Sequence, residues 1–169
     1  ARGDVRFLGK AGKGPLPNDR RQQTKIFGSY AFDRWVPGLN AGLGLTFTTG
    51  RPLTAFAANP VFTNAGEIPE GPRGSGFRTV DGFRRRTKLS KEVDLHLDYR
   101  LRLLGDAKIV GTIDAFNIFN FNTVTNYDSN SESTFGVLNP DFGQPVDPLT
   151  GLPAFQTPRQ IRIGARLEF

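Results

Sequence analysis

Apolar and polar residues alternate over five stretches of the chain, and each stretch is typical of a β-strand. In 92–103 every odd-numbered residue from Val93 to Leu103 is apolar or aromatic, and every even-numbered residue from Glu92 to Arg102 is charged or is His96. Successive side chains of a strand point to opposite faces, whereas a helix would scatter these charges around its axis. The same period predicts further strands at 25–33, 39–48, 107–118 and 159–169.

Two residues interrupt the alternation. Phe27 occupies a position that should be polar in 25–33, and the pattern in 107–118 loses its phase near Phe116. A β-bulge or the end of the strand would explain the second interruption. None of the chain's twelve prolines lies within the five stretches, as expected of strands whose backbone donors are all needed.

The connections between the five stretches alternate between short and long. Residues 34–38 form a short turn, and Gly105-Asp106 is a two-residue hairpin signal. The long connections, each beyond the roughly 12–15 residues usual in compact domains, are 1–23, 51–89 and 119–157. Short and long connections therefore lie at opposite ends of an antiparallel meander. Val5–Gly9 is a candidate for a sixth strand.

This arrangement predicts an all-β fold, an antiparallel meander that forms the last strands of a transmembrane β-barrel. The stretches are close to the roughly 9–11 residues with which a strand spans a bilayer, and barrels of the outer membrane have short periplasmic turns and long outer loops. Five strands cannot close a barrel, and an open sheet would leave backbone groups unpaired in lipid, so we expect further strands from sequence outside this chain. The alternative is a soluble, secreted β-sandwich that binds glycan or nucleic acid.

The barrel assigns a role to each face of the strands. Apolar side chains would face lipid, and polar side chains would face a wet lumen. The lumen-facing polar residues of 92–103 would include Asp94, His96, Asp98 and Arg100. If 34–38 is a periplasmic turn, then Phe32, Trp35 and Phe169 fall near one membrane interface, where aromatic residues gather. Packing of the single Trp in a small soluble core is the alternative.

The composition of the chain excludes several kinds of chemical site and of membrane segment, but it does not identify a binding partner. The chain of 169 residues is long enough for one domain and has no Cys, which excludes disulfides, thiolate metal sites and a Cys nucleophile. No apolar run approaches the roughly 18 residues of a membrane helix, and the first twenty residues lack the apolar core of a signal peptide. Because the chain begins at Ala1 and has no Met, we read it as a fragment or a processed product.

The net charge of +6 suggests an acidic partner such as nucleic acid, lipid head groups or lipopolysaccharide. The densest basic cluster, DGFRRRTK at 81–88, would lie at the outer end of strand 92–103. There Arg84, Arg85, Arg86 and Lys88 could contact lipopolysaccharide phosphates. In the soluble alternative the same cluster would be a nucleic-acid patch, and a plain solvated charge run is the third interpretation.

Two groups of acidic residues are candidates for a metal site. Asp94, His96 and Asp98 share one face of a strand, but they are more simply read as polar residues that bond to neighbouring strands. YDSNSE at 127–132 loosely resembles the start of a calcium loop, but it lacks the central Gly and the late Glu, which favours a solvated outer loop. No Ser or Asp has a placed His or Cys partner, so we expect no enzyme activity, no metal and no cofactor.

Four local patterns in order carry a family resemblance. They are TFTTGRP (Thr46–Pro52), VDLHLDYRL (Val93–Leu101), DAFNIFN (Asp114–Asn120) and PRQIRIGARLEF (Pro158–Phe169). Over roughly residues 20–169 the chain resembles the C-terminal end of a TonB-dependent outer-membrane receptor, especially the Oar-like group whose barrel follows a carboxypeptidase-regulatory-like domain. The resemblance implies a barrel of about 22 strands around an N-terminal plug that this chain lacks. It also implies localisation in the cell outer membrane and uptake or binding of a surface ligand.

The resemblance further implies the partners. They would be outer-membrane lipid and lipopolysaccharide, the barrel assembly machinery, and the TonB complex through the absent N-terminal region, with no nucleic acid expected. The closing residues follow the order polar, any, Gly, any, any, hydrophobic, any, aromatic, with Arg162, Gly164, Leu167 and Phe169 at the marked positions. This order resembles the C-terminal signal by which the barrel assembly machinery recognises outer-membrane proteins.

Overall fold

The computed structural model describes residues 13–62, 64–103 and 107–169, and these group into two compact units. The strand unit consists of Gln23–Thr48, Ser90–Asn122 and Thr157–Phe169. The loop unit consists of the described residues of 13–22, Thr49–Leu89 and Thr123–Gln156. The expected hairpin at 105–106 and the candidate strand Val5–Gly9 lie outside the described residues.

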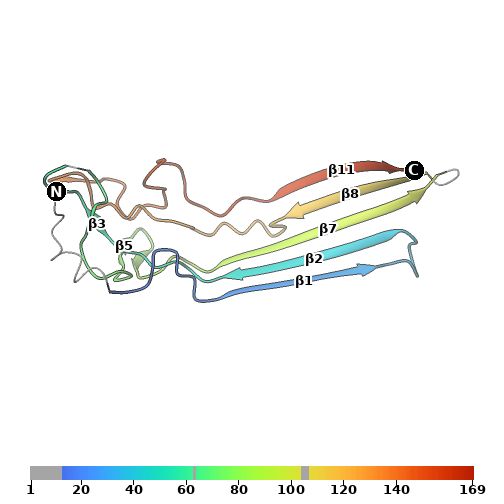
Figure 1. Cartoon of the computed structure of the whole chain (residues 1–169), viewed down its shortest axis with the longest axis horizontal. Coiled ribbons are helices and arrows are strands. Elements are labelled where there is room, and N and C mark those ends of the chain that lie inside the picture. The colour runs from blue at the N-terminus through green and yellow to red at the C-terminus, as the bar shows by residue number, and fades with distance from the viewer. Residues whose placement is uncertain (1–12, 63, 104–106) are drawn as a thin grey trace. The chain divides into compact units, whose positions relative to one another are not determined.

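The strand unit is a five-stranded antiparallel sheet (Figure 1). Its strands, in both chain order and spatial order, are β1 (Gln23–Ala31), β2 (Leu39–Thr48), β7 (Ser90–Arg102), β8 (Lys108–Phe116) and β11 (Gln160–Glu168). The expected all-β fold with an antiparallel meander is confirmed. The phase change near Phe116 is the end of β8, and β1 lies two residues earlier than the alternation placed it.

The pairing register places most apolar residues of the five strands on one face of the sheet. Leu97 of β7 lies opposite Ala41 on one side and opposite Ile113 on the other, and Ile113 in turn lies opposite Ile163. Because a one-residue slip would move a strand's whole apolar set to the other side, this agreement across four pairings is specific. The apolar face is made by Ile26, Tyr30, Leu39, Ala41, Leu43, Leu45, Phe47, Val93, Leu95, Leu97, Tyr99, Leu101, Ile109, Ile113, Ala115, Ile161, Ile163, Ala165 and Leu167.

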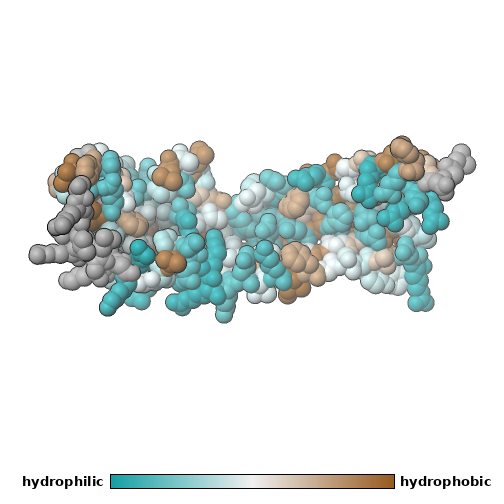
Figure 2. All heavy atoms as spheres, in the orientation of Figure 1, coloured by the Kyte–Doolittle hydropathy of each residue, from teal (hydrophilic) through white to brown (hydrophobic). Residues whose placement is uncertain are grey.

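The apolar face is exposed. Ile163 is 77% exposed, Ile161 64% and Leu43 44%, although strand residues of this kind are normally buried in a soluble protein. Hydrophobic residues come to the surface at several places on the molecule (Figure 2). A continuous apolar surface of this extent marks a site of contact with a membrane or with another protein.

The sheet is open at both edges. Among the described residues, β1 pairs only with β2, and β11 pairs only with β8. The sheet therefore does not close into a barrel within the described residues. Two long edges with free backbone groups would template pairing with further strands. No helix in the described part of the chain is long and apolar enough to cross a membrane.

The turn between β1 and β2 is tied by polar contacts and surrounded by aromatic rings. The carboxylate of Asp33 accepts a hydrogen bond from the backbone N–H of Gly38 at 2.9 Å, and Gly38 has the positive φ of 88° that such a turn requires. The ring of Phe32 lies 4.8 Å from that of Tyr30 and 6.2 Å from that of Trp35. Trp35 is 67% exposed, so within the strand unit it does not pack in a core.

The long connections fold into a small domain with its own core. Short antiparallel pairs form between β3 (Phe56–Ala57) and β4 (Ile68–Pro69), β5 (Phe77–Thr79) and β6 (Gly82–Arg84), and β9 (Glu132–Thr134) and β10 (Val137–Leu138). The buried residues Leu53, Ala55, Phe77, Val124 and Tyr127 form one cluster, and Phe142 stacks on Phe77 with 5.0 Å between ring centroids. These segments read as loops in the sequence, but their apolar residues meet in space.

Candidate functional site

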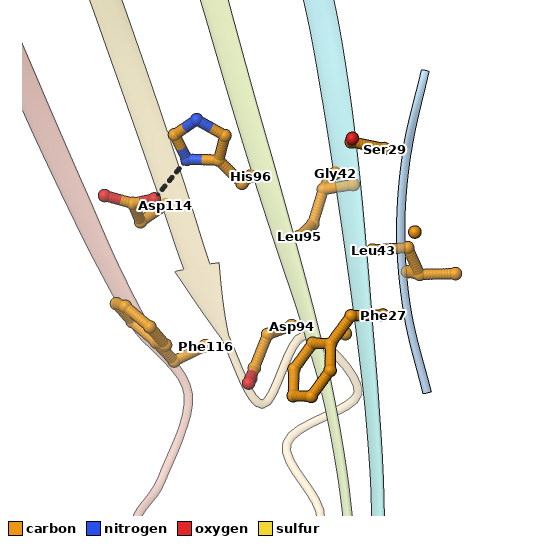
Figure 3. Close-up of a pocket in the computed structure, with 11 residues that line it drawn as sticks. Phe27, Ser29, Gly42, Leu43, Asp94, Leu95, His96, Asp114 and Phe116 are labelled. Carbon is orange, nitrogen blue, oxygen red and sulfur yellow. Dashed lines mark hydrogen bonds and ion pairs between the residues drawn. The ribbon is translucent and has the colours of Figure 1, made fainter. Parts of the chain in front are cut away.

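The polar face of the long sheet carries a row of hydrogen-bonded side chains. Register sets Ser29, Gly42, His96, Asp114 and Arg162 side by side across all five strands. The Nδ1 atom of His96 lies 2.5 Å from a carboxylate oxygen of Asp114 (Figure 3). Its Nε2 atom lies 3.5 Å from a carboxylate oxygen of Asp98. Both ring nitrogens of the single His therefore face carboxylates.

The next row continues this network. The side-chain amide of Asn40 donates to the Asp98 carboxylate at 2.9 Å, and Asp98 lies opposite Thr112 on β8. Arg100 is exposed on the same face, next to Val110. The four residues expected to share a polar face, Asp94, His96, Asp98 and Arg100, do share it, and that this face lines a lumen stays a prediction. Sequence reasoning missed Asp114 as the partner of His96, although its polar position in 107–118 was visible.

Phe27, which broke the alternation, fits because Gly44 lies opposite it. Phe27 pairs with Gly44 across β1 and β2, and a Cβ atom on Gly44 would lie 3.3 Å from the Phe27 ring. The ring therefore covers the glycine on the polar face. Together with Phe116, Asp94 and His96 it lines a groove of about 500 Å³ (Figure 3). Two aromatic rings and the carboxylates of Asp94 and Asp114 make this groove suited to a polar or cationic group rather than an anion.

Asn117 fixes the end of β8 through hydrogen bonds that use both polar atoms of its side chain. It is 1% exposed and takes a positive φ of 48°. Its amide donates to the carbonyl oxygens of Phe121 and Thr157, each at 2.9 Å, and accepts from the backbone N–H of Phe121 at 2.8 Å. Its own backbone N–H donates to Asp94 at 2.9 Å. Asn117 therefore ties the segment after β8 to the segment before β11.

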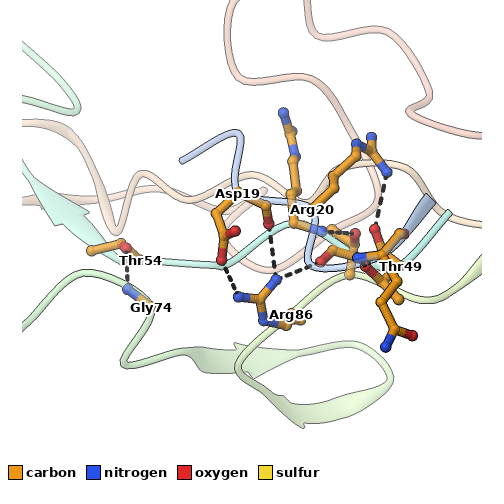
Figure 4. Close-up of polar contacts among 10 residues, drawn as sticks. Asp19, Arg20, Thr49, Thr54, Gly74 and Arg86 are labelled. Atoms are coloured by element: carbon orange, nitrogen blue, oxygen red, sulfur yellow. Dashed lines mark hydrogen bonds and ion pairs between the residues drawn. The ribbon is translucent and has the colours of Figure 1, made fainter. Parts of the chain in front are cut away.

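The basic cluster of the loop unit is largely engaged inside the protein. One guanidinium nitrogen of Arg86 donates to the Asp19 carboxylate at 2.5 Å, and the other donates to the carbonyl oxygens of Asp19 and Gly50, each at 2.9 Å (Figure 4). Lys88 lies 2.8 Å and Arg84 3.8 Å from the Asp81 carboxylate. Arg85 is exposed, and among these four expected anion contacts it is the one with no ion pair to a described residue.

Asp81 links the basic cluster to the buried core of the loop unit. The hydroxyl of the fully buried Tyr127 donates to the Asp81 carboxylate at 2.6 Å. Hydrogen bonds from Lys88 and Tyr127 hold the pKa of Asp81 below its usual value. Burial, followed by the bond to this carboxylate, raises the pKa of Tyr127 to about 12. Both residues therefore keep their neutral-pH charge states over a wide pH range.

The acidic stretch that resembles a calcium loop is engaged in structural hydrogen bonds. Asp128 accepts from the backbone N–H of Asn130 and from the Asn139 amide, each at 2.9 Å. Glu132 accepts from the backbone N–H of Ala58 at 3.0 Å and from that of Gly136 at 3.3 Å. In the described ranges no group of three His, Asp or Glu side chains is arranged to hold a metal ion.

The four expected assembly-signal positions lie on or just after β11. Arg162 lies over the ring of Phe116 at 5.5 Å, and Gly164 adjoins Thr112, whose hydroxyl would be 2.8 Å from an added Cβ. Leu167 belongs to the apolar face and is 57% exposed, and Phe169 is 98% exposed. That these residues are read by an assembly machinery stays a prediction.

Comparison with known proteins gives one informative match. No family model matches the chain, and no solved structure matches it. The TonB-dependent transporter Oar of Myxococcus xanthus is 26% identical over 193 aligned residues, which cover 92% of this chain. The chain spans 17% of the length of that curated relative. Over most of its length the chain is therefore similar to a segment of a TonB-dependent transporter.

Proposed function

We propose that this chain is a segment of the β-barrel of a TonB-dependent receptor in the cell outer membrane, which takes up or binds a ligand at the cell surface. The apolar face contacts the lipid of the outer membrane, and the polar face lines the barrel interior. Further strands on either side of β1 and β11 complete the barrel. The similarity to a TonB-dependent transporter supports this assignment.

The exposed apolar face is the observation that carries the proposal. Its aliphatic side chains extend across five hydrogen-bonded strands, and the opposite face carries His96, Asp98, Asp114 and other polar residues. A soluble β-sandwich would cover the apolar face with a second sheet, and no described strand does so. A bilayer satisfies this face directly, because its hydrocarbon core is as apolar as the side chains themselves.

The connections support an orientation for the barrel. Pairing of Thr48 with Ser90 and of Phe116 with Gln160 places both long connections at one end of the sheet. In outer-membrane barrels the long connections are extracellular. The loop unit is then the part that meets ligands and lipopolysaccharide, and the exposed Arg85 is its candidate contact with phosphate groups.

The proposed partners follow from the same assignment. The barrel assembly machinery would read Arg162, Gly164, Leu167 and Phe169, and the TonB complex would act through sequence outside this chain. The protein is not an enzyme on this proposal, because the single His pairs with Asp114 and Asp98 rather than with a Ser or Thr nucleophile. The alternative is a soluble module that binds glycan or nucleic acid, and membrane fractionation distinguishes it from a barrel segment.

Membrane fractionation tests the proposal. The full-length protein that contains this chain is expected in the outer-membrane fraction, and its migration on a denaturing gel should change on heating, because barrels resist detergent until heated. A soluble periplasmic protein serves as the control for the fractionation. Recovery of the full-length protein only in the soluble fraction would contradict the proposal.

A further inference from the structure

The loop unit contains a cleft of about 410 Å³ that lies outside the basic cluster and the polar face. Three segments that are distant in sequence form it. Arg20 comes from the segment before β1, Arg51 from the segment after β2, and Asn126, Asp147 and Phe155 from the connection between β8 and β11. A cleft built from three segments of one folded unit has a defined shape, unlike a mobile loop.

Arg51 is held in the cleft by its backbone. Its N–H donates to the Thr87 hydroxyl at 3.1 Å, and its carbonyl accepts from the Thr87 N–H at 2.9 Å. The next residue, Pro52, is buried and bridges to Arg86, which also donates to the Gly50 carbonyl. The residues on both sides of Arg51 are therefore fixed, and the guanidinium is presented from a rigid backbone.

Positive charge exceeds negative charge in the cleft. Arg51 and Arg20 both line it, and Asp147 is the one carboxylate among the lining residues. One oxygen of Asp147 already accepts from the backbone N–H groups of Leu149 and Thr150, at 3.0 and 3.1 Å. Arg20 donates to the carbonyl oxygen of Thr49 at 3.2 Å, and the guanidinium of Arg51 has no hydrogen-bond partner among the described residues.

Burial and the neighbouring Arg20 charge both lower the pKa of Arg51, and Asp147 only partly offsets them. Arg nonetheless stays charged in proteins. A half-buried guanidinium without a hydrogen-bonded partner is costly, and an oxyanion would satisfy it with two parallel N–H···O bonds. The electrostatics of the empty cleft therefore favour an anion.

Part of the wall of the cleft is apolar. It is formed by the run Leu152–Phe155, in which Phe155 bridges to Val124 and Pro153 bridges to Val146. The backbone of Ala154 is fixed by bonds to Thr125 and Pro145, each at 2.8 Å. Leu152 is 64% exposed and Phe155 40%, so both offer apolar surface to a ligand. The wall is suited to a small hydrophobic group rather than to an ion alone.

We propose that this cleft binds a small organic anion, with a carboxylate or phosphate group held by Arg51 and Arg20 and an apolar portion packed on Phe155. The inference rests on the proposed receptor function and deepens it, because it gives the chemical class of the surface ligand. The bidentate geometry of Arg51 supplies selectivity for the oxyanion. The apolar wall discriminates against inorganic anions, which have nothing to pack there.

Titration calorimetry on the full-length protein that contains this chain, purified in detergent micelles, tests the proposal with phenyl phosphate and benzoate as probes. Saturable binding of at least one probe is expected, with inorganic phosphate and benzyl alcohol binding more weakly because each has only one of the two features. Absence of saturable binding for both probes would overturn the proposal. Inorganic phosphate that binds as tightly as phenyl phosphate would overturn the role of the apolar wall.

Substitutions assign the binding to the cleft. Arg51→Gln should weaken the Kd roughly ten- to a hundredfold, because a charge-assisted bidentate contact is lost. Arg51→Lys keeps the positive charge but lacks the planar guanidinium, so its Kd should lie between those of the wild type and Arg51→Gln. A graded loss of this kind indicates lost contacts with the anion rather than a misfolded protein. Asp147→Asn should strengthen binding, since it removes a negative charge and keeps the oxygen that accepts from Leu149.

Arg78→Gln is the matched control, because Arg78 is an exposed Arg of the same unit outside the cleft. Its Kd should stay within about twofold of the wild type. If Arg51→Gln and Arg78→Gln weaken binding equally, the anion is held by general surface charge and the proposal fails. Lipopolysaccharide vesicles that displace phenyl phosphate would assign the site to a lipid phosphate instead of a soluble ligand. These results are independent of membrane fractionation, which tests the receptor assignment.

Discussion

Single polar residues hold the ends of the elements in this protein. Asn117 shows how, because its buried amide closes three hydrogen bonds and its backbone takes a left-handed conformation that costs most residues energy. Asn tolerates that conformation better than other side chains do. The sequence placed the loss of alternation near Phe116 correctly, but it gave no sign that the next residue bonds to Thr157, because that contact spans 40 positions.

Replacement of Asn117 should destabilise the protein more than replacement of a neighbour. Asn117→Ala removes three side-chain hydrogen bonds, leaves carbonyl groups unpaired and strains the backbone, so we expect a loss of about 2–4 kcal/mol in the free energy of unfolding. Denaturant titration in detergent micelles measures it. Asn122→Ala, at an exposed position in the same segment, is the control and should change the free energy of unfolding by less than about 0.5 kcal/mol. Equal effects of the two substitutions would contradict the role of Asn117.

Tyr127 makes the free energy of unfolding of the loop unit depend on pH in the alkaline range. Its folded pKa of about 12 lies above the value of about 10 expected in the unfolded chain. The contribution is therefore fully present below about pH 10 and is lost as the pH rises through about 12. Tyr127→Phe should remove this pH dependence and cost about 1–2 kcal/mol at neutral pH through loss of the bond to Asp81.

Phenolate absorbance during a pH titration checks this prediction, since the chain has only three Tyr residues. Tyr127→Phe should remove the latest step of the titration. Tyr30→Phe, at a position 55% exposed in β1, is the control and should leave that step in place. A titration in which Tyr127→Phe leaves the latest step unchanged would contradict the assignment.

At the scale of the elements, the alternation of apolar and polar residues predicted where the long strands lie and which side chains share a face of the sheet. Period-two patterns predicted the long strands, and the register then aligned their apolar sides, with Phe27, Val110 and Phe116 as exceptions on the polar face. The interruption at Phe27 could not be explained from its own strand, because the cause is Gly44 on the neighbouring strand. The short strands of the loop unit escaped sequence reasoning for a different reason: each is two or three residues long, too short for any period to show.

The two faces of the sheet should respond oppositely to a charge. Ile113→Arg places a guanidinium on the apolar face, in the middle of β8, where a bilayer would oppose it by about 2–4 kcal/mol. Ser29→Arg places the same group on the polar face of β1, next to Gly42, where water or polar residues accommodate it. We expect the first substitution to lower recovery in the outer-membrane fraction and the second to leave it unchanged. Equal recovery of both variants would contradict the facing assigned here.

The whole molecule combines a sheet that has an exposed apolar face with a loop unit that has a core of its own. The cluster around Phe77 and Tyr127 joins segments that lie before β7 and after β8, so the loop unit forms only when these connections come together. Sequence reasoning identified the basic cluster but not its partners, because Asp19 lies 67 residues from Arg86. Ion pairs between segments that distant leave no pattern in one sequence.

Assembly of the whole molecule should depend on Phe169. The residue is 98% exposed, so Phe169→Ala removes little packing within the strand unit and should barely alter its stability. If the assembly machinery reads this side chain, the substitution will instead reduce the amount of protein inserted in the outer membrane. Val137→Ala, at an exposed apolar position of the loop unit, is the control and should insert normally. Unchanged insertion of Phe169→Ala would refute the signal.

The account rests on the claim that the apolar face meets lipid and the polar face meets water, and cysteine labelling along β7 tests it most directly. The chain has no Cys, so each substitution introduces the chain's single thiol. In outer membranes that contain the protein, His96→Cys and Asp98→Cys should react with a water-soluble maleimide, whereas Leu95→Cys and Leu97→Cys should not, because lipid excludes the reagent. Labelling that is equal at all four positions, or strongest at the two Leu positions, would contradict the account.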